Sequence, residues 1–223
     1  MDKKAQIDIE SLNTQYAKLD VYKKVEQLYC DFAEEDIMLT SAFAATSAFL
    51  LKVFSDINKN QKIYFIDTGY HFKETLIYKE YLTQLYQLNV ESIKANEESH
   101  QLTEEQSMWI KNPNRCCEIN KVEPLQVIKG NYKVWVSGLM RWQSDFRGSL
   151  NYFEKRNDIL KFYPLMDIGF IERDEFIKEH HLPFHPLKSK GYHSIGCAQC
   201  TVPGDDRKGR WNNAPKTECG LHL

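Results

Sequence analysis

Cysteine is the residue type whose placement in this sequence points most directly to chemistry. Cys116 and Cys117 are adjacent, and Cys197 and Cys200 form a Cys-x-x-Cys pair. Four thiolates in two close pairs can hold a zinc ion or an iron–sulfur cluster. Structural zinc usually takes ligands two to four residues apart within each pair, so the adjacent pair fits zinc poorly. A cluster spreads its irons over a larger body that adjacent cysteines can reach, and the sequence therefore predicts a metal or cluster site.

A fifth cysteine, Cys219, lies outside this set, close to the end of the chain at Leu223. Chain ends tend to be mobile and exposed, so a structural cysteine rarely belongs there. An exposed thiol is a liability unless its reactivity is used. By itself Cys219 is as compatible with an incidental thiol as with a nucleophile. Cys30, in contrast, follows an apolar helical pattern and is predicted to be a core residue.

Basic residues supply the second chemical signal. The chain has 29 Lys and Arg against 31 Asp and Glu, a net charge of −2, which argues against broad nucleic-acid binding. An anionic small ligand would instead need a local cluster of cations. The second half of the sequence offers candidates for one: Arg115, Lys121, Arg141, Arg147, Arg207, Lys208 and Arg210. Taken singly, most such residues are solvated surface charges.

The elements that must position these residues alternate along the chain. Apolar runs predict strands over residues 36–40, 62–66, 88–93 and 132–137, and helical spacing predicts helices over residues 1–30, 47–54, 72–88 and 115–128. Strands alternating with helices predict an α/β fold with a doubly wound, mostly parallel sheet covered on both faces. Ligands bind beyond the carboxyl ends of such strands. The polar segments 41–47, 67–74 and 138–147 are therefore expected to face one crevice.

The length and composition fit a single domain with a tail. At 223 residues, 42% hydrophobic and 27% charged, the chain is ordinary for a globular protein. Residues 1–200 are predicted to form one α/β nucleotide-binding domain with a helical N-terminal segment. Residues 201–216 are rich in Gly, Pro, Asn and charge, so residues 201–223 are expected to form a mobile loop and a functional tail. No run of about 18 apolar residues and no signal-like N-terminus occurs, so no membrane association and a cytoplasmic location are expected.

The motifs together resemble a known family, the assimilatory sulfonucleotide reductases, which reduce adenylylsulfate (APS) or phosphoadenylylsulfate (PAPS). The resemblance runs from about residue 36 to the end of the chain. Any one motif is modest evidence, but their number and order make the match specific. They are DTGYHFKET at 67–75, CCEINKVEPL at 116–125, GLMRWQS at 138–144, YHSIGCAQCT at 192–201, GRW at 209–211 and ECGLH at 218–222.

The resemblance implies an adenine nucleotide alpha hydrolase-like fold and thioredoxin as the electron donor. The paired cysteines are similar to those of the cluster-bearing branch, which mainly reduces APS, and this implies a [4Fe-4S] cluster on Cys116, Cys117, Cys197 and Cys200. Cys219 is implied to be the nucleophile that attacks the substrate sulfur and carries a cysteine S-sulfonate. The implied substrate contacts are Ser41, Phe43, Thr46, Ser47, Thr68, Gly69, Lys121, Gly138, Arg147, Arg207 and Arg210.

Three positions depart from the family pattern. Ala44 stands where the family typically has Gly after the Phe, and Thr46 stands where an acidic or amide residue is common. Met140 replaces the first member of a common arginine pair, leaving Arg141. Ala costs more than Gly if the backbone needs a positive φ, so the departures at Ala44 and Thr46 bear on the loop over residues 41–47.

Three alternatives stay open at this point. The first is a PAPS reductase or an enzyme that accepts both nucleotides. The second is an ATP-using adenylating enzyme of related fold, which would carry a Ser-Gly-Gly-x-Asp-Ser loop where this chain has SAFAATS at 41–47. The third is a non-enzymatic iron–sulfur or zinc protein such as a redox sensor, which leaves the Glu-Cys-Gly-Leu-His tail unexplained. The oligomeric state, including a homo-oligomer, is also open.

Overall fold

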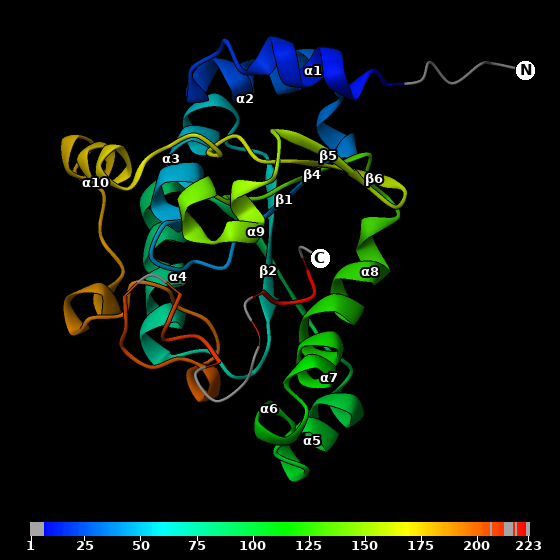
Figure 1. Ribbon diagram of the computed structural model, residues 1–223, viewed down its shortest axis with the longest axis vertical. Coiled ribbons are helices and arrows are strands. Elements are labelled where there is room, and N and C mark those ends of the chain that lie inside the picture. Colours follow the sequence, from blue (N-terminus) through cyan, green and yellow to red (C-terminus); the bar gives the residue numbers. More distant parts are fainter. Residues whose placement is uncertain (1–6, 206, 212–215, 217, 222–223) are drawn as a thin grey trace, which may run out of the picture.

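A six-stranded sheet forms the centre of the computed structural model, which describes residues 7–205, 207–211, 216 and 218–221 (Figure 1). The strand order is β3-β2-β1-β4-β6-β5, and neighbours are parallel except for the antiparallel pair β5–β6. The strands are β1 (Ile37–Thr40), β2 (Lys62–Asp67), β3 (Asn89–Lys94), β4 (Val134–Val136), β5 (Phe153–Arg156) and β6 (Ile159–Phe162).

Helices connect most of the strands. They are α1 (Ile9–Tyr16), α2 (Val21–Asp31), α3 (Ser47–Ile57), α4 (Lys73–Tyr86), α5 (Glu97–Glu105), α6 (Met108–Lys111), α7 (Pro113–Cys117), α8 (Glu123–Lys129), α9 (Asp145–Gly148) and α10 (Phe170–Glu179). Within the described part of the chain, no helix combines the length and the apolar character needed to cross a membrane.

The central strand β1 shows how the sheet is covered on both faces. Successive side chains of a strand point to opposite faces. Ile37 and Leu39 therefore enter the main apolar core with residues of α2, α3 and α4, whereas Met38 enters a second cluster with Leu125 of α8 on the other face. Figure 1 shows α3 and α4 on one side of β2 and α8 on the other. The predicted doubly wound, mostly parallel sheet is confirmed.

The N-terminal segment differs from the single helix expected over residues 1–30. Two helices, α1 and α2, are separated by residues 17–20, and the Asp20 side chain begins α2 by accepting a hydrogen bond from the Lys23 backbone N–H at 2.9 Å. Residues 1–6 lie outside the described part. The prediction that Cys30 is a core residue is wrong, because its side chain is exposed. At 100° per residue it lies 200° around α2 from the buried Leu28.

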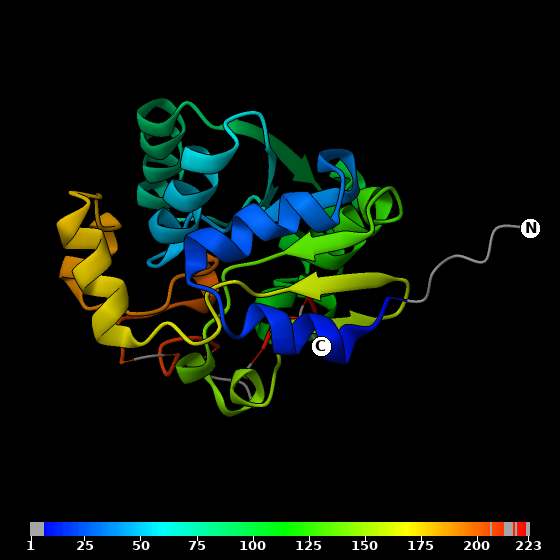
Figure 2. The ribbon, with the colours of Figure 1, turned by 90° about the horizontal axis from the view of Figure 1, so that it is seen from above.

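The hairpin of β5 and β6 was not expected from the sequence. Asn157, at a φ of 53°, lies in the turn between these strands. Helix α1 packs along the hairpin (Figure 2), where the Asn13 side chain donates to the Phe153 carbonyl at 3.1 Å and accepts from its N–H at 2.8 Å. β5 carries three consecutive charged residues after Phe153, so the alternation of apolar and polar residues that signals a strand is weak there.

The helix expected over residues 115–128 is present but changes type in its middle. It begins at Pro113, where the Asn112 side chain accepts from the Arg115 N–H at 3.1 Å, and it continues through a π-helical segment, Glu118–Val122, into α8. Short π-helical segments are rare and occur frequently at functional sites. This one carries Lys121 and follows directly on the pair Cys116–Cys117.

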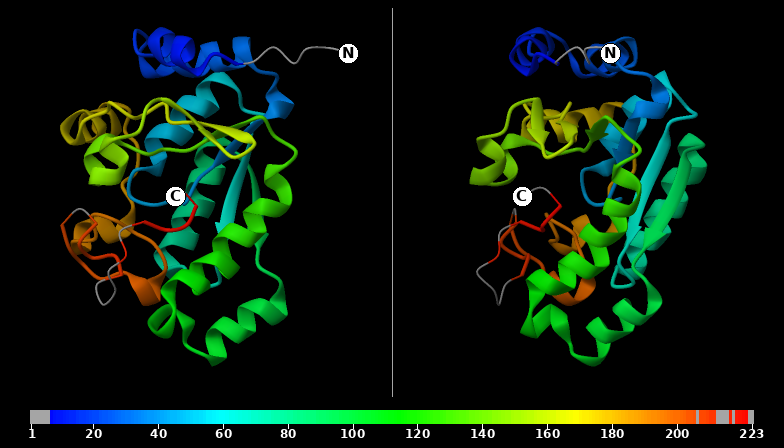
Figure 3. Two further views of the ribbon diagram at one scale, coloured as in Figure 1. Left: turned by 45° about the vertical axis from the view of Figure 1, so that its right-hand side comes forward. Right: turned by 90° about the vertical axis from the view of Figure 1, so that its right-hand side faces the viewer.

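The order of strands leaves one natural crevice. From β1 the chain adds β2 and β3 on one side, and from β4 it adds further strands on the other side. The direction in which strands are added therefore reverses between β1 and β4. Open α/β sheets bind ligands outside the carboxyl ends of their strands at such a point. The described residues of the C-terminal tail lie there (Figure 3), and the Leu221 side chain packs against the cluster of Met38, Tyr64 and Trp135.

Candidate functional site

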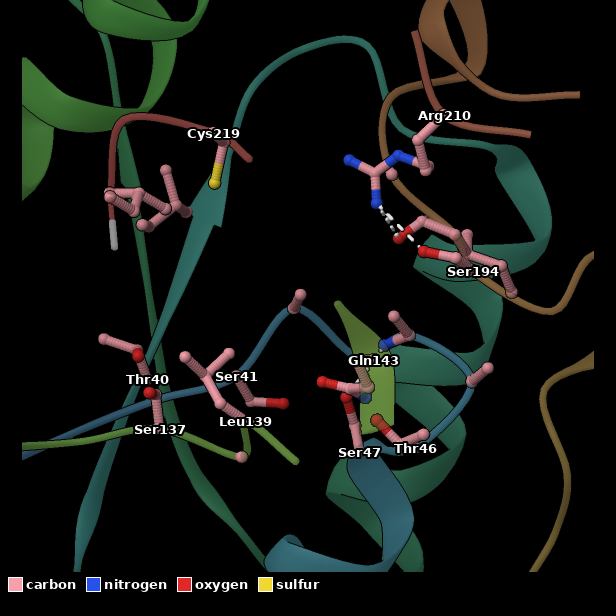
Figure 4. A pocket seen from close by; sticks show the side chains of 18 of the residues that line it. Thr40, Ser41, Thr46, Ser47, Ser137, Leu139, Gln143, Ser194, Arg210 and Cys219 are labelled. Carbon is pink, nitrogen blue, oxygen red and sulfur yellow. Dashed lines mark hydrogen bonds between the residues drawn. The ribbon is translucent and has the colours of Figure 1, made fainter. Parts of the chain in front are cut away.

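A pocket of about 220 Å³ lies at the carboxyl ends of β1 and β4. Thr40 and Ser41 line it at the end of β1, and Ser137 and Gly138 line it after β4 (Figure 4). Of the site residues predicted from the sequence, eleven contribute to its wall: Ser41, Thr46, Ser47, Thr68, Lys121, Gly138, Arg147, Cys197, Arg207, Arg210 and Cys219. The structure thus brings together residues from five separate parts of the chain.

The loop between β1 and α3 is shaped by its own hydroxyl groups. The Ser41 Oγ accepts from the Phe43 N–H at 3.2 Å, and the Ser47 Oγ accepts from the Ala44 N–H at 2.8 Å. Phe43 has a φ of 45°, is fully buried, and meets the Phe65 ring edge-on at 5.7 Å. It therefore anchors the loop from the core and lies outside the pocket wall. The positive φ falls at Phe43 and not at Ala44, so the methyl group of Ala44 adds no backbone strain.

The turn after β2 contributes Thr68 to the pocket, while Gly69 lies outside its wall. Gly69 has a φ of 73°, and a Cβ there would lie 2.6 Å from the His100 ring. This glycine is needed for the shape of the turn. His71, to which the sequence analysis gave no role, lines the pocket, and its Nε2 lies 3.0 Å from the Ile66 carbonyl oxygen. Burial lowers the pKa of His71, so its ring is neutral at physiological pH.

The tail residue Cys219 projects its sulfur toward the pocket interior (Figure 4). The preceding Glu218 is buried and accepts hydrogen bonds from Arg147, Arg207 and Ser144. Burial would raise the pKa of Glu218, but the hydrogen bond from Arg147 and the charges of both arginines outweigh it and lower the pKa. Glu218 was not predicted as a site residue, although it stands in the Glu-Cys-Gly-Leu-His motif, because an isolated glutamate usually belongs to the solvated surface.

Four cations line the pocket: Lys121, Arg147, Arg207 and Arg210. Burial, together with the charges of Arg147 and Arg210, lowers the pKa of Arg207 to about 10. Arg210 donates to the Ile195 carbonyl at 3.2 Å, and its buried Nε has no hydrogen-bond partner in the described part of the chain. Gathering cations away from water is costly unless an anion offsets their charge. The pocket is therefore suited to an anionic ligand.

The departure at Met140, and the retained Arg141 beside it, lie outside this pocket wall. Met140 is fully buried in the main core. Arg141 donates to the Asp167 carboxylate at 2.6 Å and also to the Leu150 carbonyl, so it holds neighbouring loops together. The arginine of this segment that reaches the pocket is Arg147, on the short helix α9.

The four paired cysteines meet at a second, smaller pocket. Cys116 and Cys117 at the end of α7 and Cys197 and Cys200 on a distant loop all line it, and Lys121 lies in the walls of both pockets. Burial and the charges of the other three cysteines raise the pKa of Cys116 to about 12. Burial and the charge of Cys197 raise that of Cys200 to about 11. The structure therefore brings these four predicted ligands to one place.

The surroundings of the sulfur atoms indicate what this second pocket could hold. The Asn120 Nδ2 lies 3.7 Å from the Cys116 Sγ, and the Thr68 Oγ1 lies 3.4 Å from the Cys197 Sγ. Among the residues that the structure describes, no three His, Cys, Asp or Glu side chains form a group fit for a single metal ion. Four thiols around one apolar pocket, with polar hydrogens at two of the sulfurs, form a donor set that fits a larger thiolate-bound group.

The segment after Cys200 links the two pockets. Thr201 and Arg210 form an antiparallel bridge, and the Trp211 N–H donates to the Cys200 carbonyl at 2.8 Å. The buried Trp211 ring lies 4.5 Å from the Arg210 guanidinium and 5.5 Å from that of Arg207. Of the predicted mobile loop and tail, residues 206, 212–215, 217 and 222–223 lie outside the described part. The mobility of this segment stays a prediction.

Comparison with known proteins supports one family. The family model for the phosphoadenosine phosphosulfate reductase domain matches residues 36–203. An adenosine 5'-phosphosulfate reductase of Staphylococcus haemolyticus is 36% identical, over 96% of this chain and 92% of the relative. Adenosine 5'-phosphosulfate reductase 2 of Bacillus subtilis is 37% identical, over 92% of this chain and 89% of the relative.

Solved structures agree with that result. A phosphoadenylyl-sulfate reductase from Candida auris, in a phosphate complex, aligns with a TM-score of 0.76 at 25% identity, over 90% of this chain and 99% of that one. An FMN adenylyltransferase from Candida glabrata shares the fold alone, with a TM-score of 0.61 at 15% identity over 91% of this chain and 70% of that one. The predicted adenine nucleotide alpha hydrolase-like fold is confirmed. The chain belongs to the phosphoadenosine phosphosulfate reductase domain family.

Proposed function

We propose that this protein reduces APS to sulfite and AMP, with thioredoxin as the electron donor, in cytoplasmic sulfate assimilation. One observation carries the proposal: Cys219 opens into a pocket at the carboxyl edge of the sheet that is also lined by Lys121, Arg147, Arg207 and Arg210. The pocket thus combines a nucleophile with the cations that a phosphate–sulfate anhydride requires. Full-length relatives named adenosine 5'-phosphosulfate reductase support the choice of substrate.

The first chemical step is a transfer of the sulfuryl group to Cys219. The Cys219 thiolate attacks the sulfur of APS and forms an S–S bond. The bond between sulfur and the phosphate oxygen breaks, and AMP leaves with the electron pair. The product on the enzyme is a cysteine S-sulfonate. Because the attacking thiolate and the phosphosulfate are both negative, fixed cations around the sulfur lower the barrier.

The second step returns the enzyme to its thiol form. A thioredoxin thiolate attacks the Cys219 sulfur, and sulfite leaves with the electron pair of the broken S–S bond. The second thioredoxin thiol then resolves the mixed disulfide, which regenerates the Cys219 thiolate and leaves oxidised thioredoxin. Two electrons therefore pass from the thioredoxin dithiol to sulfur. This step requires Cys219 to leave the pocket, which a position on the C-terminal tail allows.

The cysteine pocket is proposed to hold a [4Fe-4S] cluster. Cys116, Cys117, Cys197 and Cys200 would be its ligands, because all four line one pocket and its donor set fits a thiolate-bound cluster. When bound, the cluster would supply charge and rigidity at the back of the substrate pocket, since thiol chemistry supplies both electrons. Lys121 lines both pockets, so the charge of its ammonium group can interact with the cysteine site and with the substrate.

PAPS is the second candidate substrate. The matching family model and the Candida auris structure carry the PAPS name, whereas the bacterial relatives at 36% and 37% identity carry the APS name. The paired cysteines favour APS through the resemblance to the cluster-bearing branch. Initial rates with both nucleotides decide between them, and a strong preference for PAPS would overturn the choice of APS.

The direct test of the proposed function is to observe the covalent intermediate. Anaerobically purified protein is mixed with APS in the absence of thioredoxin, and the peptide carrying Cys219 is analysed by mass spectrometry. We expect that peptide to gain one SO₃ group while AMP is released in equal amount. Adding reduced thioredoxin should then remove the group and release sulfite. Iron and sulfide content of the same preparation tests the cluster.

Two serine variants supply the controls. Cys219→Ser should keep its iron and its fold but form no adduct, because a serine hydroxyl is a far weaker nucleophile at neutral pH. Cys30→Ser changes the exposed cysteine of α2 and should form the adduct at the wild-type rate. An adduct that persists in Cys219→Ser would contradict the mechanism.

A further inference from the structure

The Glu218 carboxylate, next to the nucleophile Cys219, is buried and fully engaged in hydrogen bonds, which is unusual for a residue near a chain end. The Glu218 side chain is 1% exposed, and that of Arg147 is 8% exposed. The Arg147 Nε donates to the Glu218 Oε1 at 2.8 Å and its Nη2 donates to Oε2 at 2.9 Å, a bidentate pair. Arg207 and Ser144 add bonds to the same carboxylate at 3.1 and 2.9 Å.

Arg147 has little capacity left for a substrate anion in this arrangement. Its Nε and Nη2 are directed at Glu218, and its Nη1 donates to the Gln143 Oε1. A guanidinium presents its donors in a fixed planar fork, so the edge used by Glu218 cannot also grip a phosphate. In this state of the protein, the place on Arg147 that was predicted for the substrate anion is therefore occupied by the Glu218 carboxylate.

The chain is held on the other side of Cys219 as well. The buried Lys161 on β6 donates to the Leu221 carbonyl at 2.8 Å. The Leu221 side chain packs into the cluster that contains Trp135, and a Cβ on Gly220 would lie 3.3 Å from the Val122 side chain. Cys219 thus lies between two anchored positions, Glu218 and Leu221. We call these contacts, with Arg147 and Lys161, the tail clamp.

We propose that Glu218 is a positioning residue, whose buried ion pair with Arg147 closes the tail and places Cys219 in the substrate pocket. The proposal rests on the proposed function, because it gives Arg147 the task of holding the nucleophile and leaves Lys121 and Arg210 to face the anion. A buried carboxylate is stable only while its partners remain paired with it. The ion pair and the position of Cys219 are therefore gained and lost together.

Reactivity of Cys219 in the substrate-free protein measures the clamp without requiring turnover. The protein is treated with iodoacetamide, and alkylation of the Cys219 peptide is followed by mass spectrometry. We expect Glu218→Gln to raise the alkylation rate about tenfold, which corresponds to about 1.4 kcal/mol in the opening of the tail. Glu91→Gln, which removes an exposed carboxylate that pairs with Lys62 at 2.9 Å, is the matched control and should react as the wild type does.

Catalytic measurements separate positioning from general loss of structure. In Glu218→Gln, we expect S-sulfonate formation in the first turnover to fall about tenfold while the KM for APS stays within about twofold, because the nucleotide contacts remain. Ser144→Ala removes one bond to Glu218 and should raise alkylation by a smaller factor, about threefold. It serves as the decisive variant if Glu218→Gln does not fold.

The outcomes distinguish this proposal from the proposed function. Wild-type alkylation rates in Glu218→Gln, or in Ser144→Ala if only that variant folds, would overturn the clamp even in an active reductase. An equal rise of KM and fall of kcat without a change in alkylation would also overturn it. A wild-type protein that forms no S-sulfonate, together with faster alkylation of Glu218→Gln, would refute the reductase and leave the clamp intact as a property of the tail.

Discussion

Glu218 and Cys219 are neighbours in the chain with opposite surroundings. The thiol lines the pocket, whereas the carboxylate is buried outside the pocket wall and pairs with Arg147 and Arg207. Cys219 was identified through the resemblance carried by the Glu-Cys-Gly-Leu-His motif, since its place on the tail also suited an incidental thiol. The burial of Glu218 was not foreseen, because its bidentate partner Arg147 lies 71 residues away in the chain.

Acid should weaken the pairing of Glu218. Its folded pKa lies below the ordinary value of 4.5, so its contribution to stability is present above pH 4.5 and is lost as pH falls through the folded pKa. We expect Glu218→Gln to have a lower Tm than the wild type at pH 7, by about 2–4 °C for each kcal/mol lost. The difference should narrow as pH falls below 4.5. A Tm difference that is constant over this range would contradict the assignment.

Gly69 offers a test of backbone geometry at a single residue. In Gly69→Ala the methyl group meets the His100 ring at 2.6 Å and the backbone must keep a φ of 73°. His100 cannot move freely, since its Nδ1 lies 2.7 Å from the Asn120 Oδ1. We expect a loss of about 1–3 kcal/mol in the free energy of unfolding, measured by urea denaturation.

The matched control is Gly130→Ala. A Cβ at Gly130 meets nothing within 4 Å, and its φ is −63°. The alanine should therefore be neutral or stabilise the protein by about 0.4–1 kcal/mol. If both alanine variants lose the same stability, the special conformation of Gly69 does not explain its presence.

At the scale of elements, the sequence predicted the first four strands. β1, β2 and β4 are apolar runs followed by turn residues, whereas β3 is a mostly polar segment marked by Val90 and Ile93. It also placed three polar segments at one crevice, and the pocket is lined by residues of all three. The β5–β6 hairpin was missed because it is short and rich in charge. Lys161, which lies in β6, is buried against Trp135 at 4.5 Å, and no local pattern distinguishes such a lysine from a surface one.

The burial of Lys161 in β6 can be tested through the pH dependence of the free energy of unfolding. Burial, and then the charges of Arg156 and Lys129, lowers the pKa of Lys161 from 10.5 to about 8. Between these two values Lys161 binds more protons in the unfolded chain than in the folded protein. Its contribution to the free energy of unfolding therefore rises with pH.

We therefore expect the stability of the wild type relative to Lys161→Met to increase from pH 8 to pH 10.5, as measured by urea denaturation at each pH. Lys133→Met, which removes a lysine whose side chain is 65% exposed, is the control for the effect of a new methionine. A difference between wild type and Lys161→Met that does not vary with pH would show that Lys161 titrates normally.

The whole molecule joins two pockets through shared chain segments. Lys121 lines both, and the segment that carries Cys197 and Cys200 continues directly into the one that carries Arg207 and Arg210. The hydrogen bond from the Trp211 backbone N–H to the Cys200 carbonyl ties these two segments together. The residues of both pockets are recognisable in the sequence through motifs, but the connection between the pockets depends on packing between segments that no single motif contains.

Removal of iron should therefore loosen the chain around Arg207 and Arg210. If a cluster holds Cys197 and Cys200, treating the protein with a chelator under anaerobic conditions should loosen this loop and speed tryptic cleavage after Arg210, by about tenfold. Cleavage after Lys18, in the exposed connection between α1 and α2, should be unaffected. Equal cleavage after Arg210 in both forms would show that the two pockets are mechanically independent.

The π-helical segment Glu118–Val122 has a consequence that concerns chain length and not residue identity. Such a segment accommodates an additional residue in a helix. Because the widened turn absorbs that residue, removing one residue there would restore a regular α-helix without rotating the part before it relative to the part after it. Cys116 and Cys117 should then still face their pocket while Leu125 keeps its place in the core. The effect of such a deletion should fall on Lys121, the residue of this segment that lines both pockets.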